Sequence, residues 1–154
     1  MTNFLTALGQ LGQPLSIVTL LLRIGVAVLI GAIIGIDREI KNRPAGMRTH
    51  VLVCVGAALV AMIECQSIAD AVGDASIGVS MGRITTSVIS GIGFLGAGTI
   101  FMSDHKISGL TTAASLWCTA CIGLAVGFGY IVMALLAGAI VLAILKLMPR
   151  GVHV

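Results

Sequence analysis

The side chains best suited to chemistry lie in one charged stretch of the chain. It contains carboxylates, guanidinium groups, a hydroxyl and an imidazole: Asp37, Arg38, Glu39, Arg43, Arg48, Thr49 and His50. Magnesium is a hard cation that takes carboxylate oxygens, so Asp37 and Glu39 are candidate metal ligands for Mg²⁺. The nearby arginines would repel a divalent cation, which argues against a tight site within one protomer. The alternative is an ion-pair network in which Arg48 and His50 bind these carboxylates and tie two helix ends together.

The order of the first three charges constrains how they are used. Neighbouring helix positions point about 100° apart, so Asp37, Arg38 and Glu39 cannot share one helix face. Some of them must therefore turn toward the rest of the protein.

Outside this stretch the chain is strongly apolar. Of its 154 residues, 58% are hydrophobic and 10% are charged, and the mean hydropathy is +1.13. Soluble domains average roughly 25% charged residues, and a soluble fold this small could not cover its surface with so few. The composition predicts a single all-α domain over residues 1–154, a polytopic transmembrane helix bundle.

Apolar runs predict about five spans in this bundle. Their approximate limits are residues 15–35, 49–66, 82–102, 107–126 and 130–148. No charge occurs from Ile107 to Leu145, a stretch about twice as long as one crossing of a hydrocarbon core of about 30 Å. It must fold back once, and the glycines and aromatics of residues 127–130 predict that turn. The N-terminus lacks a basic region and a cleavage site, so we expect the first span to be retained.

Basic residues are distributed unequally between the two sides of the predicted bundle. Alternating loops bring one group to the same side: Arg38, Lys41, Arg43, Arg48, Lys106, Lys146 and Arg150. The other side holds only Arg83. The positive-inside rule then predicts that the charged loop and the C-terminus are cytoplasmic and the N-terminus is outside. Asp104 falls on the cytoplasmic side and would add a third carboxylate to the charged cluster.

Two charges interrupt otherwise apolar spans. Arg23 lies roughly two to three turns from the outer end of the first span, and Glu64 lies in the outer half of the second. A charge inside the membrane is costly and usually faces the bundle or a water-filled cavity. Arg23 therefore either extends to the outer surface or pairs with Glu64.

Glycines occur in two patterns that bear on helix packing. Three pairs have the G-x-x-x-G spacing, which places two hydrogens on one helix face: Gly31/Gly35, Gly78/Gly82 and Gly123/Gly127. We assign them to packing within the chain, with a dimer face as the alternative. The third span carries a second pattern, a tract containing Gly91, Gly93, Gly96 and Gly98.

This glycine tract is not a dinucleotide-binding loop, because no soluble strand precedes it and no soluble helix follows. It either stays helical and packs very closely against a neighbour, or unwinds and exposes carbonyls to an ion. Beyond it, Gly109 precedes the fourth span, whose first turn Thr111 or Thr112 would cap.

Other chemistries have less support. Cys118 and Cys121 would share a helix face, but a redox or zinc site needs an exposed junction or a second ligand pair. We interpret them as two small buried residues. No nucleophile and base form a catalytic pattern, and no basic tract has interleaved aromatics. We therefore predict neither an enzyme nor a nucleic-acid-binding protein.

Separated motifs covering most of the chain match a known family in order. They are GAIIGIDRE at 31–39, PAGMRTH at 44–50, GAAL at 56–59, SGIGFLGAGTI at 90–100 and GLTTAASLW at 109–117. Together they resemble the MgtC/SapB family of bacterial inner-membrane proteins. Many members carry a soluble C-terminal domain. This chain stops at Val154, so we expect the membrane domain only.

The resemblance implies a role connected with magnesium. The family is linked to magnesium homeostasis, growth at low magnesium and virulence, and it is tied to inhibition of the F-type ATP synthase through its membrane sector. We expect a regulatory protein that binds another membrane protein, such as the membrane subunits of that synthase. The alternative is a magnesium or cation transporter or channel built on Asp37, Glu39 and Asp104. In either case we expect contact with membrane lipid and a homo-oligomer, most simply a dimer.

Overall fold

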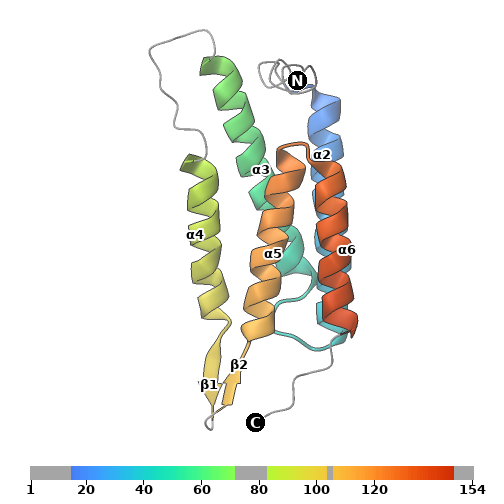
Figure 1. Ribbon diagram of the computed structural model, residues 1–154, viewed down its shortest axis with the longest axis vertical. Coiled ribbons are helices and arrows are strands. Elements are labelled where there is room, and N and C mark those ends of the chain that lie inside the picture. The colour runs from blue at the N-terminus through green and yellow to red at the C-terminus, as the bar shows by residue number, and fades with distance from the viewer. Residues whose placement is uncertain (1–14, 72–82, 104–105, 148–154) are drawn as a thin grey trace.

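The computed structural model describes residues 15–71, 83–103 and 106–147, which form five helices and one short hairpin (Figure 1). The helices are α2 (Ile17–Ile40), α3 (Met47–Ala71), α4 (Arg83–Gly98), α5 (Leu110–Gly127) and α6 (Ile131–Leu147). Three of them, α2, α3 and α5, are long and apolar enough to cross a membrane, and α4 and α6 are shorter apolar helices. The predicted all-α transmembrane bundle is confirmed, while its orientation stays a prediction.

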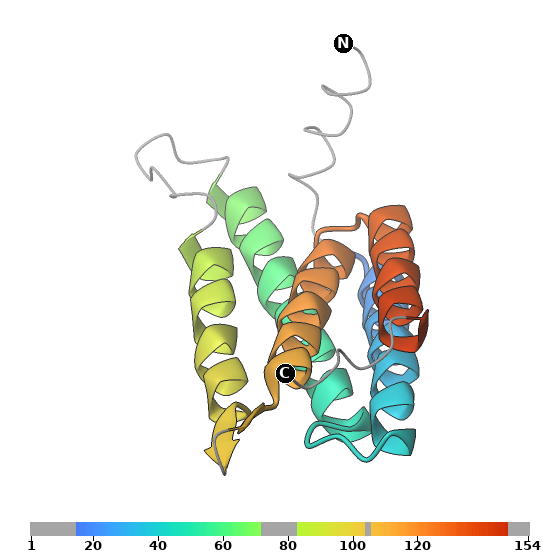
Figure 2. The same cartoon turned by 60° about the horizontal axis from the view of Figure 1, so that its bottom comes forward.

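Helices α3 and α5 form the middle of the bundle. Helix α2 packs on α3, α6 contacts α2 and α5, and α4 stands at the opposite edge, mainly against α5 (Figures 1 and 2). The loop after α2, the start of α5 and the end of α6 lie at one end of the molecule. The turn between α5 and α6 lies at the other end, as the predicted hairpin requires.

Glycines close the seams between α3 and its two main neighbours. An added Cβ at Gly31 or Gly35 of α2 would come within 3.0 Å of the α3 backbone. An added Cβ at Gly123 or Gly127 of α5 would strike carbonyl oxygens of α3. The assignment of these two spaced pairs to packing within the chain is confirmed. The third pair, at positions 78 and 82, lies outside the described residues.

The connection between α4 and α5 differs from the prediction. The sequence predicts helix as far as residue 102 and again from 107, but β1 (Phe101–Ser103) pairs antiparallel with β2 (Lys106–Ser108) there. The Thr99 hydroxyl donates to the Gly96 carbonyl at 2.8 Å and closes the end of α4. Gly109 has a φ of +92°, a conformation that favours glycine, and it turns the chain into α5. The charged and polar residues between the strands predict a turn there, but the apolar Phe101, Met102 and Ile107 are equally compatible with helix ends, so the sequence does not reveal the strand pairing.

Candidate functional site

The charged row at the end of α2 is divided between two environments. Asp37 and Arg38 are buried, with 9% and 3% of their surface exposed, whereas Glu39 is exposed. The prediction that the three do not share a face is confirmed. Arg48 and Thr49, in the first turn of α3, are both exposed and do not join the buried part of the cluster.

Both carboxylates of the row are engaged within the bundle. Lys41 Nζ lies 3.0 Å from Asp37 Oδ2 and also donates to the Leu145 carbonyl near the end of α6, at 2.6 Å. Glu39 Oε2 accepts a hydrogen bond from the backbone N–H of Met47, the first residue of α3, at 3.0 Å. Glu39 therefore joins the end of α2 to the start of α3, and Lys41, paired with Asp37, joins it to the end of α6.

The expected pairing of these carboxylates with Arg48 and His50 is wrong. His50 is fully buried and joins α3 to α5 instead. Its Nδ1 atom donates to the Gly46 carbonyl at 2.9 Å, because a carbonyl can only accept. Its Nε2 atom lies 3.1 Å from the Ser115 hydroxyl of α5. Both ring nitrogens are thus occupied by neighbours within the chain.

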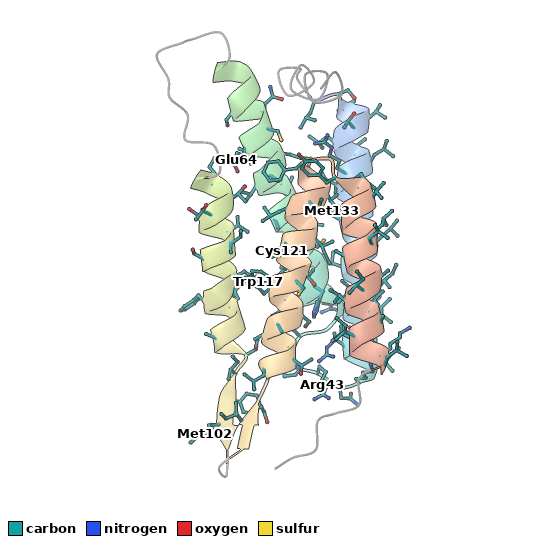
Figure 3. All side chains as sticks on the ribbon, viewed as in Figure 1. Arg43, Glu64, Met102, Trp117, Cys121 and Met133 are labelled. Atoms are coloured by element: carbon teal, nitrogen blue, oxygen red, sulfur yellow. The ribbon has the colours of Figure 1, made fainter. Side chains whose placement is uncertain are left out.

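The arginines of this region are less well satisfied than the carboxylates. The Nε and Nη2 atoms of Arg38 are buried without a hydrogen-bond partner, and so is the Nε atom of Arg43. The backbone N–H of Arg43 donates to the Arg38 carbonyl at 3.0 Å, which folds the loop back over the end of α2. Figure 3 shows Arg43 at the end of the bundle where α6 finishes.

At the opposite end, the two intramembrane charges also bind helix ends. Arg23 Nη1 donates to the carbonyl of Gly127, the last residue of α5, at 2.6 Å. Glu64, 3% exposed, accepts from the backbone N–H of Thr85 at 3.1 Å and from the Thr85 hydroxyl, in the first turn of α4 (Figure 3). These bonds attach the two charges to different helices rather than to each other.

These contacts follow one electrostatic rule. Free carbonyls at a helix C-terminus carry partial negative charge, and free N–H groups at an N-terminus carry partial positive charge. The cations Arg23 and Lys41 bind carbonyls at the ends of α5 and α6. The anions Glu39 and Glu64 bind N–H groups at the starts of α3 and α4. These four charges therefore fasten helix ends.

The glycine tract is a regular part of α4, so its unwound alternative is wrong. Gly96 faces α5, where an added Cβ would lie 3.5 Å from the Ala113 Cβ. At Gly91, Gly93 and Gly98 an added Cβ would meet nothing within 4 Å. The expected close packing within the chain is therefore limited to Gly96.

An open, apolar groove runs between α3 and α4. It encloses about 370 Å³ and is lined by Leu52, Val53, Gly56, Val88, Gly91, Ile92, Leu95 and Ala120. Gly56 of α3 and Gly91 of α4 contribute no side chain, and an added Cβ at either meets nothing within 4 Å. The backbones of both helices are accessible from this groove.

Helix α5 departs from two expectations. Its N-cap is Gly109, which makes no side-chain cap hydrogen bond. Thr112 is buried and Thr111 is exposed, so the predicted threonine cap is wrong, because the left-handed glycine makes the turn. Cys118 and Cys121 are free and only partly buried, whereas we expected them to be buried.

A sequence profile of the MgtC family matches residues 24–153, and the motifs at both ends of the bundle fall inside this range. The chain belongs to the MgtC family. Protein MgtC of Salmonella typhimurium strain LT2 is 42% identical over 122 residues, which are 79% of this chain and 49% of the relative. Protein MgtC of Brucella abortus is 39% identical over 128 residues, 83% of this chain and 50% of the relative.

Another relative of this MgtC-family chain is named "Putative magnesium transporter YhiD", from Escherichia coli K12. It is 35% identical over 126 residues, 82% of this chain and 59% of the relative. The chain thus spans about half the length of the curated relatives it matches. No solved structure matches it.

The carboxylates do not form a favourable magnesium site in the described part of this MgtC-family chain. Among those residues no group of three or more His, Cys, Asp or Glu side chains comes together. Asp37 binds Lys41 and lies beside the buried cation Arg38, and Glu39 binds a backbone N–H. Asp104, the expected third carboxylate, lies outside the described residues.

Proposed function

We propose that this chain is a regulatory membrane protein of the MgtC type that acts by binding another membrane protein. The groove between α3 and α4 is the observation that supports this function best, because Gly56 and Gly91 leave the helix backbones open. In lipid, helices associate through close packing at small residues rather than through the hydrophobic effect. A groove of this kind suits a transmembrane helix of a partner.

Helix α4 supports the same proposal through its exposure. Its less exposed described positions form one narrow face: Thr85, Val88, Ile92 and Gly96. Elsewhere on the helix, Phe94 is 82% exposed and Leu95 is 54% exposed. A helix held along one narrow face at the edge of the bundle has ample surface left for a partner helix.

The first partner to test is the membrane sector of the F-type ATP synthase, which the family resemblance implies. A role in magnesium homeostasis, low-magnesium growth and virulence, in the bacterial inner membrane, belongs to the same proposal. A second copy of this chain is the competing occupant of the groove, and it would make a homodimer.

The alternative function is a magnesium or cation transporter or channel. The name of the relative called "Putative magnesium transporter YhiD" favours it, and so does the buried carboxylate of Asp37. Lys41, Arg38 and Arg43 act against it, because their positive charges lower the attraction of this carboxylate for a divalent cation. The regulatory function therefore ranks first.

Two measurements on the purified chain separate these functions. Liposomes containing the protein should show no magnesium flux with an entrapped indicator, and the detergent-solubilised protein should bind the synthase membrane sector. Gly56→Leu and Gly91→Leu fill the groove and should weaken binding by about tenfold or more. Gly25→Leu is the matched control. A Cβ added at Gly25 also meets nothing within 4 Å, but Gly25 lies on α2, away from the groove.

Three results would count against the proposal. Magnesium flux that disappears with Asp37→Asn would establish the transporter. Binding that survives both groove substitutions would reject the groove as the contact surface. Self-association that competes with binding of the synthase sector would assign the groove to a dimer.

A further inference from the structure

Two arginines at the charged end remain after the contacts between helix ends are assigned. Asp37 is bound by Lys41, and Glu39 is bound by a backbone N–H. Arg38 keeps two buried nitrogens without a partner, and Arg43 keeps one. Arg38 is 3% exposed, so bulk water does not compensate for the missing hydrogen bonds. A buried charged donor left without an acceptor is expensive, and an anion would remove that cost.

The atoms involved indicate the class of anion. Nε and Nη2 of Arg38 lie on the same edge of the planar guanidinium, and their N–H bonds run parallel. This edge binds carboxylates and phosphates through two parallel hydrogen bonds. The Nε atom of Arg43 adds a third buried donor. A phosphate has enough oxygens to accept hydrogen bonds from both arginines. A carboxylate has two oxygens, and the edge of one guanidinium already uses both.

No acceptor within the cluster takes these donors. The charge of Asp37 acts on Arg38, but its Oδ2 atom is hydrogen-bonded to Lys41. Both ring nitrogens of His50 are engaged, with Gly46 and Ser115. Arg43 acts on Arg38 as a like charge, so the pair strengthens the positive potential of the site.

The position of the two arginines suits a phosphate at the membrane surface. Ile36 and Ile40 lie on the same turns of α2 but on the helix face opposite Arg38, and they are 44% and 76% exposed, so this end of α2 presents an apolar face outward while Arg38 points inward. The predicted orientation places this end at the cytoplasmic leaflet, whose anionic lipids attract basic residues. We propose that Arg38 and Arg43 form a binding site for a phosphate group, supplied by an anionic phospholipid or by free phosphate.

The test uses the full chain in a maltoside detergent, with phosphatidylglycerol and inorganic phosphate as probes. Native mass spectrometry follows the lipid, and thermal shift follows phosphate. Arg38→Lys keeps the charge but removes the two-donor edge, and Arg43→Gln removes the third donor. Each should weaken binding by about tenfold or more, the loss expected for one charge-assisted hydrogen bond. Arg48→Gln is the control, because it removes the same charge from an exposed side chain of the same region.

Each outcome decides the proposal. Saturable lipid binding that phosphate does not displace assigns the site to a phospholipid, and displacement by phosphate assigns it to the free ion. Equal weakening by Arg48→Gln, equal binding of acetate at the same ionic strength, or no saturable binding of either probe overturns the site. Arg43 is only partly buried, so Arg43→Gln should fold and keeps the test valid even if Arg38→Lys does not.

Discussion

The glycines between α2, α3 and α5 differ from the glycines of α4 in what lies in front of them. At Gly35 and Gly127 one added methyl group would collide with the backbone of α3, whereas at Gly91 and Gly93 it would meet nothing within 4 Å. The same residue type closes a seam in one region and leaves an open surface in the other. The neighbours of a membrane glycine, more than its spacing, indicate whether it serves folding or recognition.

The largest expected effect is at the closed seam. Gly127→Ala should lower the free energy of unfolding by about 3 kcal/mol, because the new methyl group overpacks against a backbone carbonyl that cannot easily move. Unfolding by sodium dodecyl sulfate in mixed micelles measures it. Gly25→Ala, on an open face of α2, should be neutral or stabilise by up to about 1 kcal/mol. If Gly127→Ala and Gly25→Ala changed the free energy of unfolding equally, the proposed difference between packed and open glycines would be wrong.

A second prediction asks whether the seam also depends on polar contacts. His50→Leu should cost about 2 kcal/mol of stability, because the substitution removes the bridge from α3 to α5 and the side-chain hydrogen bond to the Gly46 carbonyl, which keeps only the backbone N–H of residue 50 as its donor. A double-mutant cycle with Ser115→Ala should give a coupling energy of about 1 kcal/mol. Strict additivity would mean that glycine packing alone holds these two helices.

A smaller effect is expected at the link to α4. Glu64→Gln should cost about 1 kcal/mol, since a neutral amide is a weaker acceptor for the first turn of α4. The loss should be local, so hydrogen exchange should accelerate in α4 and stay slow in α2, α3 and α5. If hydrogen exchange accelerated equally in all helices, α4 would be packed as firmly as α2, α3 and α5.

The smallest effect is expected on the open face of α4. Gly93→Ala should change stability by less than about 0.5 kcal/mol, or raise it slightly, because alanine is the better helix former and has room there. Gly35→Ala is the matched substitution at the seam and should be clearly destabilising. Thermal denaturation in detergent compares them, and a costly Gly93→Ala would reveal a neighbour of α4.

The architecture follows from the sequence because the bilayer imposes it: apolar runs must be helical to satisfy their backbone. Boundaries follow less well. The first predicted span stops at residue 35, but α2 continues to Ile40 and carries the charged row in its last turns. Hydropathy falls at the first charged residue, Asp37, whereas the backbone hydrogen bonds of the helix continue past it. The β1–β2 hairpin is hidden for another reason: residues 104–106 predict a turn, but the apolar Phe101 and Ile107 on either side are equally compatible with helix ends.

The candidate site is predictable in its location but not in its partners. The sequence identifies Arg23, Glu39 and Glu64 as notable charges, but the groups they bind are backbone carbonyls or N–H groups at the ends of other helices. Such groups carry no residue-type signal. The spare donors of Arg38 and Arg43 are equally hidden, because only the three-dimensional arrangement shows that Asp37 and Glu39 are already taken.

Helix α4 also raises a question of timing during synthesis. It precedes α5 in the chain, yet α5 supplies its main packing surface, while the tight seam of α3 is made with α5. A chain made from its N-terminus therefore completes the α2–α3 pair first and has α4 in the bilayer before its principal neighbour exists. The bonds between Glu64 and Thr85 are available in that interval. Helix α5 then packs against both α3 and α4, which are already in the bilayer. The order in which the helices are synthesised therefore differs from the order in which they pack.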